Sequence, residues 1–309
     1  MLPVRARRSQ GKWRGTPARS VGRWPRDLRT TLLALLRRSV PARRTVAQCE
    51  SSARSVDALF EPSVCRNCGA RRERPWCAEC GQGVVGRLSV GDVWREFWQR
   101  SRWFESAHLR AVLNLVHGPG NVAREYVLGA RKRHVHPLKL LLVVVTLLAW
   151  LLSESHYLTA GQDELSREMA TLVSWGRWSF TLGLFATFGA SLLVYPRRLG
   201  TNPTEHLVLA TYVQAVILSA NAINLLPLLF LDTARWVPCW RTAAGWYMWP
   251  IELLILGFAF RQFFLLDLTR AAARVRLGIA LATFVIAKKA LLLGYGHLIV
   301  QFVLRTPSP

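Results

Sequence analysis

The amino-acid sequence predicts a mainly α-helical, polytopic membrane protein with a small cysteine-rich module ahead of its first span. Three observations predict this fold class. Long apolar runs fill the chain after residue 137, and four cysteines lie close together between residues 65 and 80. In addition, most of the 41 Lys and Arg residues precede the apolar part. The mean hydropathy of +0.19 therefore averages over two very different halves.

The 309-residue chain has a formal net charge of +23, and most of this excess belongs to its polar first part. Such a surface can contact nucleic acid, anionic lipid or an acidic protein, and composition alone does not select among them. Residues 1–60 mix recurring arginines with Pro, Ser and Gly, which is typical of a disordered basic tail. A start codon assigned too early, or an organelle transit peptide, would give a similar composition.

Residues 61–86 contain two Cys-x-x-Cys-Gly pairs separated by eight residues. Zn²⁺ prefers four ligands in a tetrahedron, and a two-residue spacer lets one tight turn present both sulfurs to the same ion. The glycine after each pair can take a positive φ, which lets the chain fold beneath the sulfurs. The pattern therefore predicts one structural zinc ion in a ribbon that the metal must hold together, because the module is too small for a core. The predicted ligands are Cys65, Cys68, Cys77 and Cys80.

Other chemistry at this module is less well supported by the sequence. A pair of dithiol redox sites would require a βαβ pattern, which is missing around both pairs. The glycines at 81, 83 and 86 fit a dinucleotide motif, but no hydrophobic strand precedes them. The chain shows no serine elbow, HExxH motif or Walker loop, so the sequence nominates no catalytic and no cofactor-binding residues. Whether the protein is an enzyme stays open, and the sequence leans against it.

Residues 87–136 are predicted to form amphipathic helices beside the membrane. Trp94, Trp98 and neighbouring apolar residues form an aromatic stripe, whereas the arginines point largely elsewhere. This pattern suits the membrane interface, and an ordinary helix packed on a protein core is the alternative. A basic segment follows at 130–137, and its histidines are expected to be interface residues. Anionic headgroups are predicted to contact four basic side chains, although membrane orientation alone would also require charge here: Arg131, Lys132, Arg133 and Lys139.

Residues 137–309 are predicted to form the transmembrane domain. A spanning helix needs about 20 apolar residues, and its backbone polar groups must be satisfied internally. Basic residues before the first span and in the second and fourth loops, with acidic residues in the first loop, place the N-terminus in the cytoplasm. Arg235 and Arg241 in the third loop argue against this orientation, because it places their positive charges outside the cytoplasm. Five spans are expected, near 138–152, 175–195, 206–231, 246–266 and 279–304.

Several polar residues are predicted to lie inside the membrane, where they are costly and often functional. Those of the third span follow one another at helical spacing, which indicates either interhelical hydrogen bonds or a substrate path. The cost of burying the charge of Glu252 would be bearable if Glu252 paired with a lysine of the fifth span. The alternative is that this span begins near residue 290, with both lysines at its edge. The residues concerned are His206, Gln214, Asn221, Asn224, Glu252, Lys288 and Lys289.

The order of these parts resembles a bacterial membrane family called domain of unknown function 3667. The cysteine segment at 65–82 is similar to the zinc ribbon of that family, which ends in Cys-Gly-Gln. The resemblance continues through Pro119-Gly120, Tyr126, Gly129 and the basic residues before Pro137, and it reaches Glu205-His206-Leu207. Ala130 departs from the pattern, since the family usually has a basic residue there. The resemblance implies an architecture and a location, namely a zinc ribbon followed by transmembrane helices, and no known reaction.

These observations favour a multi-pass inner-membrane protein whose cytosolic zinc ribbon is a structural or protein-docking module. The expected partners are anionic membrane lipids and another protein. A transporter or channel for a small solute or ion, which would use the polar stripe of the third span, is the alternative. A membrane-tethered nucleic-acid binder is a further alternative, disfavoured because the basic tail has few aromatic residues that could stack on bases.

Overall fold

The structure is a computed structural model that describes residues 64–71, 74–99, 115, 118–155, 157, 181–231 and 233–305. The chain divides into two compact units, Met1–Arg44 and Thr45–Pro309, and every described residue belongs to the second. The predicted tail at 1–60 and the first part of the predicted second span therefore lie outside the described residues. The predicted domain boundaries stay predictions.

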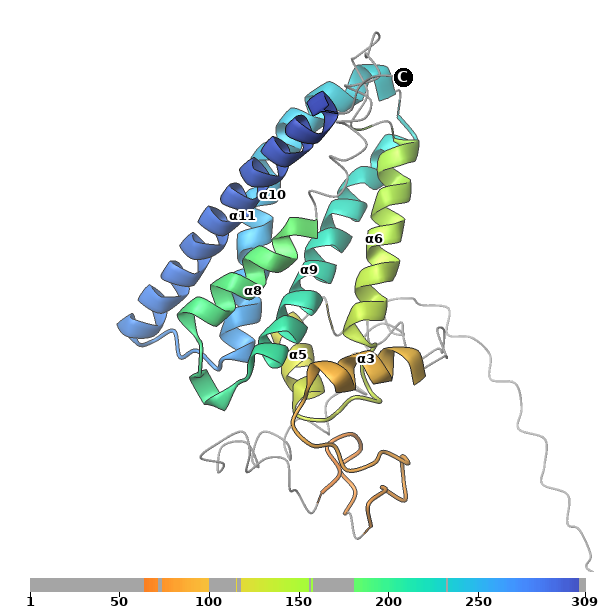
Figure 1. The fold of residues 1–309 in the computed structure, drawn as a ribbon, viewed down its shortest axis with the longest axis vertical. Helices are drawn as coiled ribbons and strands as arrows, with labels where there is room; N and C mark the ends of the chain where they lie inside the picture. The colour runs from red at the N-terminus through yellow and green to blue at the C-terminus, as the bar shows by residue number, and fades with distance from the viewer. Residues whose placement is uncertain are drawn as a thin grey trace, which may run out of the picture. The chain divides into compact units, whose positions relative to one another are not determined.

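The described part of the chain is mainly α-helical, as the sequence predicts, and its only β structure is two isolated bridges. Two short helices, α3 (Val90–Gln99) and α5 (Pro119–Val127), precede the long apolar ones (Figure 1). Two 3₁₀ turns, Arg198–Gly200 and Leu226–Leu229, flank α9. The longer helices are α6 (Pro137–Glu154), α8 (Leu182–Val194), α9 (Pro203–Leu225), α10 (Thr233–Phe263) and α11 (Ala271–Arg305).

Four described segments are long and apolar enough to cross a membrane, and they identify a membrane protein. They are Pro137–Glu154, Pro203–Leu229, Arg235–Phe263 and Ala271–Gln301. The predicted span at 175–195 is represented by α8, whose 13 residues extend for about 20 Å. This length is short of the roughly 30 Å of a hydrocarbon core, so α8 does not cross a bilayer unaided.

The helix ends show that α6 and α9 begin at the same end of the bundle. The hydroxyl of Tyr212, in α9, donates to the carbonyl of Val135 just before α6, at 2.6 Å. Both helices therefore begin at the same end of the bundle, as Figure 1 also shows. A chain that leaves this end in α6 and starts again there in α9 must come back over residues 155–202. The helix α8, which packs against α9 and α11, supplies the last part of that return.

Local sequence explains where these helices begin. Pro119, Pro137 and Pro203 each occupy the first turn of a helix, where a missing N–H is harmless. The N-terminus of α9 also has a capping box, in which Asn202 accepts from the N–H of Glu205 at 2.9 Å and the Glu205 carboxylate accepts in return. Gly129, with φ of +106°, turns the chain after α5 towards α6.

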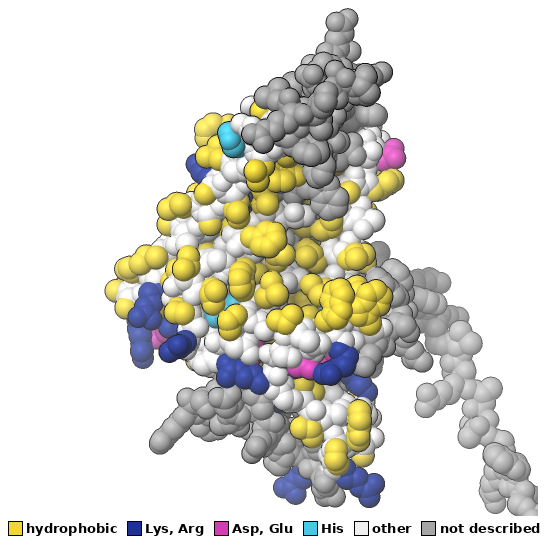
Figure 2. Space-filling view, in the orientation of Figure 1, with side chains coloured by type: hydrophobic (Ala, Val, Ile, Leu, Met, Phe, Trp, Pro, Cys, Tyr) yellow, Lys and Arg dark blue, Asp and Glu magenta, His cyan; other side chains and the backbone are white. Residues whose placement is uncertain are grey.

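The core of the bundle lies where α5, α9 and α10 meet. Tyr126, Tyr212, Tyr195, Phe260 and Phe264 are among the largest fully buried side chains, and they stack in edge-to-face and parallel pairs. A second apolar cluster joins α6 to the distal part of α9. Hydrophobic side chains cover much of the outer surface of the bundle, whereas Lys and Arg gather around the end that carries α3 and the cysteines (Figure 2). This distribution is the one expected for a helical bundle in lipid.

Candidate functional site

The four cysteine sulfurs form one cluster. All of them lie within 4.8 Å of one another. The Sγ atoms of Cys65 and Cys80 are 3.6 Å apart, and those of Cys68 and Cys77 are 3.5 Å apart. Four sulfurs bound tetrahedrally at about 2.3 Å from one zinc ion would be separated by about 3.8 Å. The cluster therefore has the size and the donor set to hold one metal ion.

The two Cys-x-x-Cys-Gly segments have the same backbone conformation. The N–H of Gly69 donates to the carbonyl of Cys65 at 2.8 Å, and the N–H of Gly81 donates to Cys77 at 2.8 Å. Both glycines have positive φ, +81° and +63°, as the sequence predicts. An antiparallel bridge closes each segment, Val64 with Arg71 and Trp76 with Gly83. Each segment is thus a small knuckle that presents two sulfurs.

The sulfur cluster is electrostatically asymmetric. Backbone N–H groups, first that of Cys80, lower the pKa of the Cys77 thiol. Desolvation of its sulfur is the main cause that raises the pKa of Cys68 to about 12, and the neighbouring thiols add to this effect. Four thiolates so close together would repel one another, so the arrangement requires a cation at its centre for all four to be ionised.

The second knuckle is attached to the helical bundle by Lys132 and Gln82. The ammonium of Lys132 donates to the carbonyls of Cys80 and Gly81, both at 2.9 Å. Gln82 is only 4% exposed. Its side-chain amide donates to the carbonyl of Gly129 and accepts from the N–H of Lys132 at 3.4 Å. The turn after α5 therefore holds the backbone of the metal-ligand segment directly.

A second attachment joins the segment after the knuckles to the start of α9. Arg87 lies with its Nε 3.4 Å from the carboxylate of Glu205, a side chain that is completely buried. Arg87 also donates to the carbonyl of Gly200. In addition, the amide of Asn202 donates to the carbonyl of Leu88 at 3.0 Å. The residues that cap α9 therefore also hold the ribbon in place.

The helix α3 packs one face on the bundle and exposes the other. Glu96 accepts from the hydroxyl of Tyr126 at 2.9 Å and from Arg131 at 2.5 Å. On the opposite face, Trp94 and Trp98 are 58% and 67% exposed. The helix therefore uses a polar anchor on its inner side and leaves its two tryptophans outside.

The four basic residues predicted to contact lipid have different surroundings. Arg131 is buried against Glu96, and Lys132 is engaged by the knuckle carbonyls. Lys139 is 7% exposed, with its ammonium 5.6 Å from the ring centre of Phe97. Arg133 is half-buried and lies 3.9 Å from Glu125. All four have protein contacts on this end of the bundle, and a contact with headgroups stays a prediction.

Two of the predicted intramembrane residues, His206 and Gln214, hold helices together. His206 is fully buried, with its ring nitrogens 3.0 Å from the Thr201 hydroxyl and 3.2 Å from the Ser191 hydroxyl. Gln214 packs so tightly on α8 that a Cβ at Gly183 would lie 2.6 Å from its Oε1. Both side chains thus join α8 to α9.

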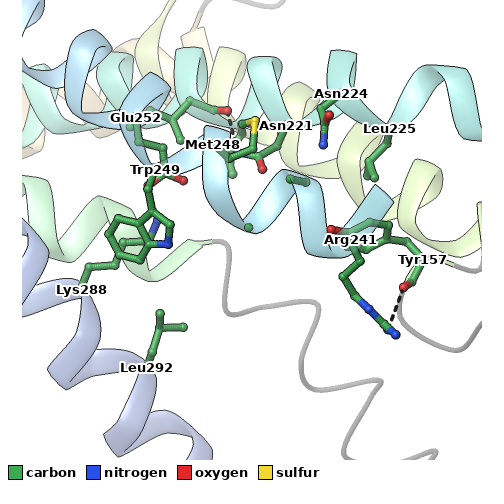
Figure 3. Close-up of a pocket in the computed structure, with 14 residues that line it drawn as sticks. Tyr157, Asn221, Asn224, Leu225, Arg241, Met248, Trp249, Glu252, Lys288 and Leu292 are labelled. Atoms are coloured by element: carbon green, nitrogen blue, oxygen red, sulfur yellow. Dashed lines mark hydrogen bonds and ion pairs between the residues drawn. The ribbon is translucent and has the colours of Figure 1, made fainter. Parts of the chain in front are cut away.

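Four other predicted residues come together in a cavity of about 320 Å³ between α9, α10 and α11. They are Asn221, Asn224, Glu252 and Lys288, and Figure 3 shows them with their neighbours. The volume falls in the lower range of small-molecule sites. The cavity is amphipathic, because leucine, isoleucine and methionine side chains complete its walls.

The structure decides which lysine partners Glu252. Lys288 and Glu252 form an ion pair in which both side chains are largely buried, 13% and 9% exposed. The Lys288 ammonium also lies 4.8 Å from the ring centre of Trp249. Lys289 is exposed on the other side of α11. The helix α11 runs unbroken from Ala271 to Arg305 and carries both lysines in its interior, whereas the start of the membrane span near residue 290 stays an alternative.

Sequence reasoning missed Arg241, Trp249 and Tyr157 as residues of this cavity. Arg241 lies on α10 beside the cavity and donates to the carbonyl of Tyr157 at 3.5 Å. From the sequence, Arg241 is placed only in the third loop. Its spacing could have indicated the cavity, because residues 241, 245, 248 and 252 lie on one face of a helix that also carries Glu252.

Comparison with curated proteins and with solved structures gives no match. One family model matches the chain, that of the family described as "Protein of unknown function (DUF3667)", over residues 108–149. The matched segment includes α5, the basic residues of the following turn and most of α6. These are the elements that hold the second knuckle and begin the first span. The resemblance predicted from the sequence is therefore confirmed over residues 108–149, where the chain matches the DUF3667 family.

Proposed function

We propose that the protein is a multi-pass inner-membrane protein whose ribbon binds one Zn²⁺ in the cytoplasm and acts as a structural cap on the bundle. The observation that carries this proposal is the double attachment of the ribbon, by Lys132 to the second knuckle and by Arg87 to Glu205. A module that served only to capture a distant partner would not need such attachments to the ends of two helices. Metal binding would then fix the start of α9 as well as the ribbon.

Zinc is proposed as the metal because of the donor set. Four cysteine sulfurs in two knuckles leave no open coordination position, which suits a structural ion. Soft thiolate ligands favour zinc over the harder cations Mg²⁺ and Ca²⁺. Redox-active iron can also bind four thiolates, so metal analysis must identify the ion.

The cytoplasmic placement of the ribbon is proposed from the charges at the ends of the helices. The turn before α6, the loop before α9 and the start of α11 carry Arg131–Arg133, Arg197 and Arg198, and Arg270, Arg274 and Arg276. These segments share one end of the bundle with the ribbon (Figure 1). The positive-inside rule places such an end in the cytoplasm. A five-crossing path, with α8 in the second crossing, would leave the C-terminus on the other side.

Partners are proposed from the two exposed surfaces at this end. The tryptophans of α3 would lie in the headgroup region of the membrane, where aromatic rings with polar edges are favoured. A protein partner would dock on the outer side of the second knuckle, where Trp76 is 68% exposed and Val84 is 59% exposed. Nucleic acid is not expected to bind there.

Metal analysis of the full-length protein, purified in detergent, tests the proposed cap. We expect one zinc per chain in the wild type and none in a Cys68→Ser/Cys77→Ser variant. Cys239→Ser is the matched control, because Cys239 is an exposed cysteine on α10 outside the cluster. Hydrogen exchange at residues 196–206 should become faster in the double variant only. A metal-free wild type, or unchanged exchange after metal loss, would contradict the proposal.

A second candidate function is the transport of a small solute or ion through the bundle. The observation that favours it is the cavity between α9, α10 and α11, with its buried Glu252–Lys288 pair. Solute flux into vesicles that contain the purified protein would test it. Flux that is abolished in Glu252→Gln and retained in Lys289→Met would support transport, whereas an absence of flux for every probe would count against it.

A further inference from the structure

The cavity between α9, α10 and α11 has two ends of different charge. Its charged lining residues are Arg241, Glu252 and Lys288. Glu252 and Lys288 neutralise each other in their ion pair, which leaves the guanidinium of Arg241 as the uncompensated charge. No carboxylate among the described residues pairs with Arg241, whose guanidinium is exposed and donates to the Tyr157 carbonyl. The cavity therefore has a net charge of one positive unit.

The positive end is separated from the ion pair along the cavity. Arg241 and Glu252 are eleven residues apart on α10, which corresponds to about 16 Å of helix rise. Figure 3 shows Arg241 and Tyr157 at one side of the cavity and Glu252, Trp249 and Lys288 at the other. A ligand held at Arg241 would therefore not compete with Glu252 for the guanidinium.

Asn224 is a further hydrogen-bond donor in the lining of the cavity. The hydroxyl of Tyr247 donates to Oδ1 of Asn224, which fixes the orientation of the amide. Its Nδ2 has no partner among the described residues and belongs to the lining of the cavity. Asn221 uses its own Nδ2 on the carbonyl of Ile217, at 2.9 Å. The guanidinium of Arg241 is a charged donor at one end of the cavity, and a charged donor of this kind is typical of an oxyanion site.

The remaining lining suits the apolar part of a ligand. Leu218, Leu225, Met248 and Leu292 also line the cavity. Gly245 widens it, because a Cβ at this position would meet no atom within 4 Å. The space next to Arg241 can therefore accept atoms without any movement of α10.

From these observations we propose that this cavity binds an oxyanion, a phosphate or a carboxylate, through Arg241. The oxyanion can be the headgroup of an amphiphile, whose chain occupies the leucine-lined part, or a small free anion. The inference shares its location with the second candidate function, but it requires binding only. A ligand that is bound and not transported would leave it intact, while an absence of flux would remove only the transport proposal.

The site also accounts for a charge that the membrane orientation does not explain. The positive-inside rule disfavours arginines at the end of the bundle opposite the ribbon, where the first turns of α10 lie. A ligand anion would compensate Arg241 at that end. Arg235 is exposed, as Arg241 is, but it lies 5.9 Å from the ring centre of Trp236 and does not line the cavity. It is thus a matched control for a charge on the same helix.

Calorimetric titration of the full-length protein in phosphatidylcholine nanodiscs tests the inference. The probes are dioctanoyl phosphatidate and inorganic phosphate. We expect saturable binding of one anion per chain, weakened roughly ten- to hundredfold in Arg241→Gln, because a hydrogen bond to a charged group is lost. Arg235→Gln should bind as the wild type does. Binding of phosphatidate alone would assign the site to an amphiphile, and equal binding of inorganic phosphate would assign it to a small anion.

A second variant tests the cavity without a change of charge. Gly245→Leu should fill the space beside Arg241 and abolish binding, whereas Gly189→Leu, at an open position of α8 outside the cavity, should not. This pair also decides the matter if Arg241→Gln fails to fold. The inference is overturned if the wild type binds neither anion saturably, or if Arg241→Gln and Gly245→Leu bind with wild-type affinity.

Discussion

Arg87 lies with its guanidinium Nε 3.4 Å from the carboxylate of Glu205, so a residue that follows the second knuckle contacts the first turn of α9. Glu205 is completely buried and also caps its own helix. One carboxylate thus joins the end of the ribbon to the start of a membrane span. A change in the ribbon would therefore be transmitted first to α9, the most deeply buried of the four membrane-capable helices.

Removal of the Arg87–Glu205 pair should destabilise the protein. We expect Arg87→Ala and Glu205→Gln each to lower the free energy of unfolding by about 1–3 kcal/mol, because hydrogen bonds to charged groups contribute this much. Glu205→Gln keeps an oxygen that can cap α9, so it isolates the ion pair from the cap. Chemical denaturation of the purified protein in detergent measures both variants.

The control for this prediction is Arg71→Ala, an exposed arginine of the first knuckle. Its replacement should change the free energy of unfolding by less than about 0.5 kcal/mol. The Arg87→Ala/Glu205→Gln double variant should lose less than the sum of the single losses, because both remove the same interaction. Strict additivity would show that the two residues act independently.

Metal binding to the ribbon should release protons. Thiols must be deprotonated to bind a metal, and the raised pKa of Cys68 keeps this thiol protonated at pH 7 when no metal is bound. A lower pH favours the protonated, metal-free form, so the affinity for zinc should fall as the pH falls. Titration of zinc into the chelator-treated protein in two buffers of different ionisation enthalpy would measure the release. An enthalpy independent of the buffer would contradict this expectation.

Replacement of one partner of the Glu252–Lys288 pair should destabilise the protein more than replacement of both. A single change leaves one charge buried without its partner, so Glu252→Gln or Lys288→Met should each cost about 3–5 kcal/mol. The double variant should recover most of this loss. Lys289→Met is the matched control, because its side chain is exposed on the neighbouring position of α11. Equal losses in the Lys288 and Lys289 variants would argue against a specific pair.

The tryptophans of α3 should lie in the membrane surface. In a chain whose Cys49 and Cys239 are replaced by serine, Trp98→Cys should react slowly with a water-soluble maleimide in vesicles and faster in detergent. Trp76→Cys, an equally exposed position of the ribbon, should react quickly in both. The reason is that the headgroup layer shields α3 and leaves the ribbon in water. Equal rates at both positions in vesicles would contradict this placement.

Much of the architecture was predictable because its signals are local. The knuckles depend on residues within a few positions of one another, since Gly69 and Gly81 take the positive φ that the Cys-x-x-Cys-Gly pattern requires. Pro137 and Pro203 start helices where the sequence suggests starts. The apolar runs give four segments that can cross a membrane. The second predicted span is described only from residue 181 onward, where it forms α8.

The cavity was predictable only in part. Glu252 was expected to pair with a lysine, yet Lys288 and Lys289 are chemically identical, and only the rotation of α11 about its axis turns one of them towards α10. His206 and Gln214 follow the same polar stripe as Asn221 and Asn224, but α8 covers the first two. The sequence could not show this, because the position of α8 depends on contacts with α9 and α11.

Residue order thus determined the four-sulfur cluster, the apolar helices and the basic end of the bundle, because each depends on side chains that are neighbours in the chain or along one helix. Tertiary structure alone decided that Lys132 and Arg87 hold the ribbon on the bundle, and that Arg241 shares a cavity with the Glu252–Lys288 pair. These relations join residues far apart in the chain. They depend on the axial shift and rotation with which helices pack, and close packing of whole surfaces sets both quantities.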